Sequence, residues 1–253
     1  MSGSSNTWEK LKEFTDARIA LGRTGGSLKT SELLDFRKDH ALAKDAVWTA
    51  LDLPLLQNKL EKLSLPYLTL NSEAQDRETY IKRPDFGRRL SQESVTEIKN
   101  SNPQPSDISI LITDGLSANA ISSHAINFLE EFLPLIKQFS LGPICLINQG
   151  RVAISDPVGE LFPSEISIIL IGERPGLSAP NSMGIYLTYH PKAGNTDEKR
   201  NCISNVRVGG LPYAYAAGKL AFLTSEALRL KLSGVDLKDT FDSQLLRNDF
   251  GEQ

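Results

Sequence analysis

The chain has 253 residues, 40% of them hydrophobic and 23% charged, which is ordinary usage for a globular protein and excludes disorder as its main state. No run approaches the roughly 18–20 consecutive apolar residues of a membrane span, and the N-terminus lacks the features of a signal peptide. We expect a soluble protein whose residues 1–7 form a flexible tail. Its two cysteines and three histidines predict no disulfide framework, no zinc cluster and a reducing, cytoplasmic setting.

The formal net charge of −3 gives no global field that would attract nucleic acid. Basic and acidic residues are interleaved, except at the pairs Lys82-Arg83 and Arg88-Arg89. We expect these two pairs to be solvated or ion-paired rather than to track phosphates. Nucleic acid is therefore not an expected partner.

The first hundred residues carry mainly helical patterns. Apolar residues recur at roughly helical spacing over 8–19, where Gly22 could cap the helix end. A longer helix is predicted from Thr30, a plausible N-cap, to the region of Pro54. The apolar residues of 67–70 predict either a short strand or an extended connector.

The next stretch contains the predicted domain boundary. Residues 76–90 are interrupted by Pro84 and predict two short helical turns around a bend. The segment 100–106 is polar and has two prolines, which suit neither a helix nor a central strand. We therefore divide the chain into a helical N-terminal region, 1–100, and a second domain, 107–253.

Strand and helix signals alternate after this linker. The predicted strands are 108–112, 144–148 and 166–171, with 185–189 as a candidate fourth. The predicted helices are 117–138 with a kink or break at Pro134, 158–162 and 212–232. This alternation predicts an α/β fold, in which a Rossmann-like, mostly parallel sheet with flanking helices follows the helical N-terminal region.

Ligands of open parallel sheets bind beyond the carboxyl ends of the strands, where this chain has loops rich in glycine and polar residues. These loops are 113–119, 148–152 and 172–177. Glycine lets the backbone approach a ligand closely, but it also simply turns a chain after a strand. With three such loops on one edge, we weigh a ligand site and plain turns equally.

The familiar catalytic and nucleotide motifs are missing. The sequence has no G-x-G-x-x-G, no G-x-x-x-x-G-K-[ST] and no G-x-S-x-G. His124 falls within a predicted helix, and we expect it to be packed or capped rather than to act as a base. The chain therefore has no convincing catalytic constellation of its own, and we assign no catalytic residue and no metal ligand.

Two polar positions near the expected loops have alternative interpretations. Cys202 follows Lys199 and Arg200, which could lower its pKa, but we favour a small buried residue in a polar loop near a ligand. Glu173 comes directly after a predicted buried strand. It either accepts hydrogen bonds from ligand amides or pairs with Arg174.

Several long motifs resemble one known family, the small (light) subunit of ethanolamine ammonia-lyase. They are Thr15-Asp-Ala-Arg-Ile-Ala-Leu-Gly-Arg-Thr-Gly-Gly26, Thr113-Asp-Gly-Leu-Ser-Ala118, Gln149-Gly-Arg-Val152, Leu170-Ile-Gly-Glu-Arg-Pro-Gly-Leu177 and Arg200-Asn-Cys-Ile-Ser-Asn205. The resemblance runs in order from about residue 10 to residue 238. It therefore covers nearly the whole chain.

The resemblance implies a lyase that uses adenosylcobalamin for the radical conversion of ethanolamine to acetaldehyde and ammonia. A large subunit, a β/α barrel, would carry the substrate, and this chain would close over the cobalamin. The implied cofactor contacts are Val152, Glu173 and Cys202. Val152 would offer an apolar contact to the corrin, Glu173 would accept from its rim amides, and Cys202 would allow close approach.

The implied cobalamin should bind base-on, with its own dimethylbenzimidazole on the cobalt. Cobalamin domains that displace this base use an Asp-x-His-x-x-Gly motif, and here Lys38, Ser122 and Thr188 stand two residues before the histidines. Exposed apolar residues such as Trp8 and Phe14 either dock on the large subunit or pack within this chain.

Alternative functions follow from the same features. The chain could be a stand-alone Rossmann-like binding or regulatory module without catalysis. A nicotinamide-dependent oxidoreductase is disfavoured by the missing glycine fingerprint. The resemblance also implies residence in a bacterial microcompartment.

Overall fold

The computed structural model describes residues 10–15, 17–19 and 21–242, so the expected tail over 1–7 and Trp8 lie outside the described residues. The main sheet has six strands in the order β3-β5-β4-β6-β7-β8. Their bounds are β3 Tyr67–Asn71, β4 Ser106–Thr113, β5 Ile144–Asn148, β6 Ser164–Gly172, β7 Met183–Tyr189 and β8 Arg200–Val206. The first four strands in that order pair in parallel and the last two pair antiparallel, which confirms the predicted mostly parallel α/β sheet.

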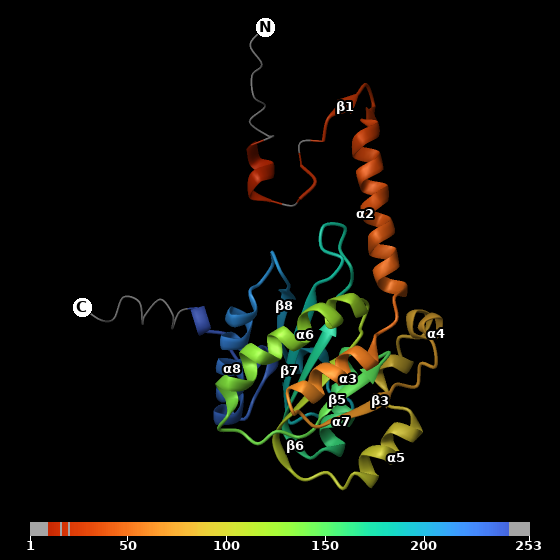
Figure 1. Ribbon diagram of the computed structural model, residues 1–253. Coiled ribbons are helices and arrows are strands. Elements are labelled where there is room, and N and C mark those ends of the chain that lie inside the picture. The colour runs from red at the N-terminus through yellow and green to blue at the C-terminus, as the bar shows by residue number, and fades with distance from the viewer. Residues whose placement is uncertain (1–9, 16, 20, 243–253) are drawn as a thin grey trace, which may run out of the picture.

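Helices cover both faces of this sheet (Figure 1). They are α2 Thr30–Trp48, α3 Leu53–Lys62, α4 Arg77–Lys82, α5 Gln92–Asn100, α6 Ala118–Phe132, α7 Ser155–Leu161 and α8 Tyr213–Leu230. One apolar cluster joins alternate residues of β4 and β6 to α3, α6 and α8, and a second joins the opposite side chains to α5 and α7. Burial on both faces explains the near-continuous apolar runs of β4 and β6.

The structure corrects the expected N-terminal helices. Within the described part of 8–19, Lys10 and Leu11 are α-helical and a 3-10 turn, Lys12–Phe14, follows; the expected helix is confirmed there but does not continue to residue 19, and its side chains over 10–14 stay exposed. The N-cap of α2 is Lys29 rather than Thr30, and α2 ends at Trp48. Pro54 does not end that helix: it lies in the first turn of α3, where its missing N–H is tolerated.

Other expectations before residue 107 have mixed outcomes. The strand alternative for 67–70 is confirmed by β3, and the two helical turns of 76–90 by α4 and the 3-10 turn Phe86–Arg88. The helices α3 and α5 were not predicted, although Asp52 and Ser91 cap their first turns. β3 precedes the expected boundary yet pairs with β5, and the boundary itself stays a prediction.

The second half follows the expected element order with one addition. The break at Pro134 is confirmed, because α6 ends at Phe132 and a 3-10 turn, Leu133–Ile136, follows. β8 was not predicted as a strand, so Cys202 lies in a strand and not in the expected polar loop. β8 is an edge strand in which Arg200, Ile203 and Val206 are buried and the other residues are partly or fully exposed. Its sequence therefore lacks the apolar run by which the central strands were predicted.

Helix α2 projects away from the sheet and its covering helices (Figure 1). Ala46 is its buried residue, while large apolar side chains of α2 are exposed. They include Leu34, Phe36 and Trp48. Phe14 is 83% exposed, so it does not pack within this chain as one interpretation expected.

A buried ion pair fastens β8 to α7. Both amino groups of the Arg200 guanidinium donate to Asp156, at 2.9 and 2.7 Å, and Arg200 also donates to the Thr188 hydroxyl. The two charged side chains are 1% and 2% exposed. Desolvation of these charges is offset only while both partners are present.

Replacing Asp156 with alanine should therefore remove the bidentate partner of the buried Arg200 charge and leave it the exposed carboxylate of Asp197, 3.3 Å from its Nε. We expect the free energy of unfolding to fall by about 3–5 kcal/mol, measured by urea denaturation followed by circular dichroism. The double variant Asp156→Leu/Arg200→Met should recover most of this loss. The exposed pair Arg229–Glu226 is the control, and its loss should cost less than about 1 kcal/mol; a double variant as unstable as the single one would contradict the explanation.

Candidate functional site

The three glycine-bearing loops meet at one edge of the sheet, as expected. They follow β4, β5 and β6, which run in parallel. Together they line a cavity of about 390 Å³ that includes Leu116, Val152 and Glu173, one residue from each loop. The structure thus brings two of the three expected cofactor contacts to a single cavity.

The glycines at this edge are explained by contacts between the loops themselves. Gly115 has a φ of +54°, and a side chain there would overlap the Gly172 carbonyl. A side chain at Gly172 would in turn overlap the Ser117 carbonyl. The Leu116 N–H donates to the Gly172 carbonyl at 2.9 Å, so two loops pack backbone to backbone. Of the two interpretations of these glycines, loop packing accounts for them without a ligand.

Asp114, the first residue after β4, organises this edge. Its buried carboxylate accepts from the Gln149 N–H at 2.8 Å, the Thr113 hydroxyl at 3.1 Å and Arg77 Nη1 at 2.9 Å. Gln149 has a φ of +59°, a left-handed backbone that the bond from its own N–H to Asp114 supports. Burial raises the pKa of Asp114 to about 6, while Arg77 and the hydrogen bonds act in the opposite direction.

Tyr80 of α4 forms a wall of the cavity that sequence reasoning missed. Its ring is fully buried, and its hydroxyl donates to the Gly150 carbonyl at 3.1 Å. The Arg151 guanidinium lies 4.0 Å from the ring centroid and donates to the Tyr80 carbonyl. Burial raises the pKa of Tyr80, so the phenol stays protonated. The spacing of Arg77 and Tyr80 along one face of α4 was the available signal.

Glu173 directly follows the last residue of β6, and hydrogen bonds hold its carboxylate in place. It accepts from the Ser182 hydroxyl at 2.6 Å and from the Asn205 N–H at 3.2 Å. Among the described residues no ion pair joins Glu173 to Arg174, so that alternative is wrong. Two carboxylate oxygens hold about four lone pairs, so acceptor capacity remains for a ligand.

Cys202 lies beside the cavity rather than in its lining. It is exposed on β8, so the expectation of a buried residue is wrong, and it pairs in register with Tyr186 of β7, whose side chain does line the cavity. Desolvation raises the pKa of the Cys202 thiol; the Tyr186 hydroxyl lowers it and the Glu173 charge adds to the rise. The thiol is therefore protonated at neutral pH, which agrees with an unreactive role.

His124 is a packed histidine, as expected. Its Nε2–H donates to the Asn181 carbonyl at 2.9 Å, and its Nδ1 accepts from the Tyr213 hydroxyl at 2.7 Å. Burial lowers the pKa of this imidazole. Both ring nitrogens are engaged within the protein.

The expected ion pairing of the basic doublets is also observed. Lys82 pairs with Glu78, Arg83 with Asp85, and Arg89 with Glu73.

In the part of the chain that the structure describes, no cluster of three or more His, Cys, Asp or Glu could hold a metal ion. No helix there is long and apolar enough to cross a bilayer.

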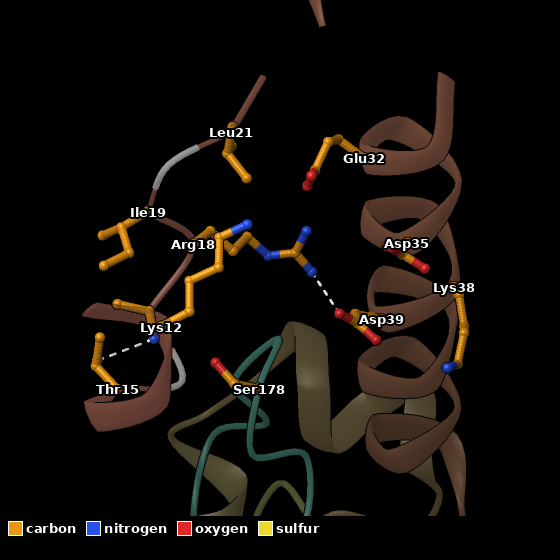
Figure 2. Close-up of a pocket in the computed structure, with 11 residues that line it drawn as sticks. Lys12, Thr15, Arg18, Ile19, Leu21, Glu32, Asp35, Lys38, Asp39 and Ser178 are labelled. Atoms are coloured by element: carbon orange, nitrogen blue, oxygen red, sulfur yellow. Dashed lines mark hydrogen bonds and ion pairs between the residues drawn. The ribbon is translucent and has the colours of Figure 1, made fainter. Parts of the chain in front are cut away.

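A second cavity lies between the N-terminal segment and α2, away from the expected site residues. Figure 2 shows Arg18 reaching across it to Asp39 of α2, with Ser178 of the β6–β7 connection below. Its lining is mostly charged and polar. It contains none of the expected contacts Val152, Glu173 or Cys202.

The raised pKa of Asp114 predicts a pH dependence of stability. A carboxyl whose pKa is higher in the folded state stabilises the fold below its unfolded pKa, and that contribution is lost as pH rises to about 6. Wild type should therefore lose about 2–3 kcal/mol between pH 4 and 7 from this group, and Asp114→Asn should not.

The measurement is the difference in unfolding free energy between the two proteins across that pH range. The lowered pKa of His124 acts with the opposite sign, stabilising at high pH, but it is common to both proteins and cancels. The asparagine variant should gain on wild type as pH rises. Parallel profiles would show that Asp114 does not titrate in this window.

Nearly the whole chain is similar to one family of enzymes. Residues 5–238 match the family model described as ethanolamine ammonia-lyase light chain (EutC). The ethanolamine ammonia-lyase small subunit of Pseudomonas fluorescens (strain SBW25) is 47% identical over 249 residues, 96% of this chain and 90% of that one. The corresponding subunit of Xanthomonas campestris pv. campestris (strain B100) is 48% identical over 98% and 93% of the two chains. That of Azotobacter vinelandii is 49% identical over 93% and 89%.

Proposed function

The chain belongs to the ethanolamine ammonia-lyase light chain family, and we propose that, as the small subunit of this carbon–nitrogen lyase, it helps to hold adenosylcobalamin against a large subunit. Ethanolamine would be the substrate of the complex. The observation that carries the proposal is the cavity at the carboxyl edge of the sheet, which contains Val152 and Glu173 and has Cys202 beside it.

The residues at this edge suit a broad apolar ring with polar groups on its rim. Leu116 and Val152 supply apolar surface, and Glu173 has lone pairs for amide N–H groups. Arg151 lines the same cavity, and its buried Nε has no hydrogen-bond partner among the described residues. A cavity with apolar walls and a few polar groups is the usual form of a cofactor site.

The cavity accommodates only part of so large a cofactor, so a second protein surface must complete the site. When bound, adenosylcobalamin supplies the radical that starts the chemistry, and this chain orients it and excludes water. No residue of this chain is assigned a catalytic role. The base-on mode rests on the missing Asp-x-His-x-x-Gly motif, since Lys38, Ser122 and Thr188 stand two residues before the three histidines.

The projecting helix α2 is the proposed docking element for the large subunit. Leu34 and Trp48 are more than half exposed, and Phe36 is 42% exposed with the Arg18 guanidinium 5.3 Å from its ring centroid. A helix gains most of its stability from packing an apolar face, and α2 packs little of its own. Exposed Phe14 belongs to the same proposed surface. Residence in a bacterial microcompartment rests on the family resemblance.

The direct test mixes the purified small subunit with a separately purified large subunit and adds adenosylcobalamin and ethanolamine. The measured quantity is the acetaldehyde formed. We expect turnover in the mixture and none with the small subunit alone, because the substrate site lies on the partner. Cobalamin titration followed by absorbance should show tight binding only in the complex. Tight binding by this chain alone, with no gain of turnover on mixing, would favour a stand-alone binding module.

Glu173→Gln should keep the fold but weaken adenosylcobalamin in the assembled complex, because an amide replaces one of the two accepting oxygens. Loss of a hydrogen bond to a charged group predicts about tenfold weaker affinity or more. The measurement is cofactor affinity by spectroscopic titration. Glu130→Gln, on the exposed side of α6, is the matched control.

Cys202→Ser tests the neighbouring contact in the same titration. We expect a modest effect, since the protonated thiol offers contact surface and no covalent chemistry. Unaltered cofactor affinity in Glu173→Gln would argue against the proposed contact of Glu173 with the cofactor. Complete loss of turnover in Cys202→Ser with cofactor still bound would contradict the passive role of the thiol.

A further inference from the structure

Arg77, the first residue of α4, lies where the projecting helix meets the sheet. Its Nε donates to the Val47 carbonyl in the last turn of α2 at 2.6 Å. Its Nη1 donates to Asp114 and to the Gly115 carbonyl, both at 2.9 Å. One guanidinium therefore touches the base of α2 and the loop after β4.

Few other contacts hold α2 among the described residues: it packs against α6, and the Arg18–Asp39 ion pair joins it to the N-terminal segment. Among the described residues, Arg77 to Val47 is the one hydrogen bond between α2 and the chain that follows residue 52. Ala46 is the buried residue of the whole helix. A cation at the C-terminal carbonyls also favours the helix dipole.

The length of α2 amplifies any movement at its base. Its 19 residues span about 28 Å at about 1.5 Å per residue. A tilt of about 10° at the base would displace the far end by about 5 Å. A docking surface that moves this far cannot present a defined face to a partner.

The other end of the Arg77 contacts leads to the cavity. Asp114 accepts from Arg77 and also from the Gln149 N–H, which begins the loop carrying Val152. The guanidinium lies 4.8 Å from the ring centroid of Tyr80, a wall of the cavity. Three acceptor atoms lie around one planar group, an arrangement that the single ammonium of lysine does not reproduce.

We propose that Arg77 is a positioning residue that fixes the orientation of α2 relative to the cofactor edge. The inference rests on the proposed function, in which the large subunit docks on α2 and the cofactor lies at that edge. Docking of the partner and binding of the cofactor then depend on the same side chain. Arg77 touches neither substrate nor cofactor.

The first experiment measures the orientation of α2 directly. Spin labels are placed at Leu34→Cys on α2 and Glu93→Cys on α5 of the full chain, in a Cys202→Ser background; Cys145 is buried and stays unlabelled. Wild type should give a narrow distance distribution, and Arg77→Lys and Arg77→Met broader ones. The control Arg83→Met removes an arginine that also pairs with an aspartate and lies 4.1 Å from the centroid of an aromatic ring, and it should stay narrow.

The second experiment uses the assembled enzyme. Arg77→Lys should weaken large-subunit affinity and raise the KM for adenosylcobalamin, each by about tenfold, with kcat at saturation nearly unchanged. A merely structural role would instead lower kcat with the folded fraction and leave KM alone. Arg77→Lys keeps the charge beside Asp114, so it remains informative if Arg77→Met does not fold.

The two experiments separate the inference from its premise. Equal distance distributions in wild type and Arg77→Lys would overturn the positioning role, whatever Glu173→Gln does to cofactor affinity. A broadened distribution with unchanged KM and unchanged subunit affinity would overturn docking on α2 as proposed. Broadening together with both losses supports the inference.

Discussion

The buried carboxylate of Asp114 is the constraint on which the rest of the candidate site depends. It holds the left-handed start of the second loop through the Gln149 N–H and the base of α2 through Arg77. A buried carboxylate needs such partners, because an unpaired one would cost several kcal/mol. The partners that satisfy the Asp114 carboxylate therefore also fix the positions of two loops and of the projecting helix relative to one another.

The edge built in this way is a rigid half-site rather than a complete active site. The glycines of the first and third loops allow direct backbone packing, which leaves those loops little freedom. The ion pair between Arg200 and Asp156 anchors β8, so the Arg of the Arg-Asn-Cys motif is structural, while its Cys pairs in register with Tyr186 beside the cavity. The side chains left at the cavity can hold and orient a ligand, and none forms a catalytic constellation. Such a division suits a subunit whose chemistry lies on a partner.

Much of the architecture could be predicted because its signals are local. Apolar runs of β-branched residues identified β4, β5 and β6, and their parallel order placed the following loops on one edge, where Val152 and Glu173 now share a cavity. The signals failed where burial did not shape the sequence. β8 is an edge strand with exposed polar residues, and α3 and α5 have capping residues that were not read as helix starts.

The sequence by itself determined the alternation of strand and helix, the edge that carries the loops, and the motifs that connect the chain to its family. Periodicity and turn chemistry act over a few residues, so they are legible without a structure. Only the tertiary structure decided that Tyr80 walls the cavity, that Cys202 stands beside it on a strand, and that Arg77 joins α2 to Asp114. Those contacts link residues that are 16 to 70 positions apart, as in Tyr80 with Gly150 and Tyr186 with Cys202, and no local pattern encodes which distant partner packing will select.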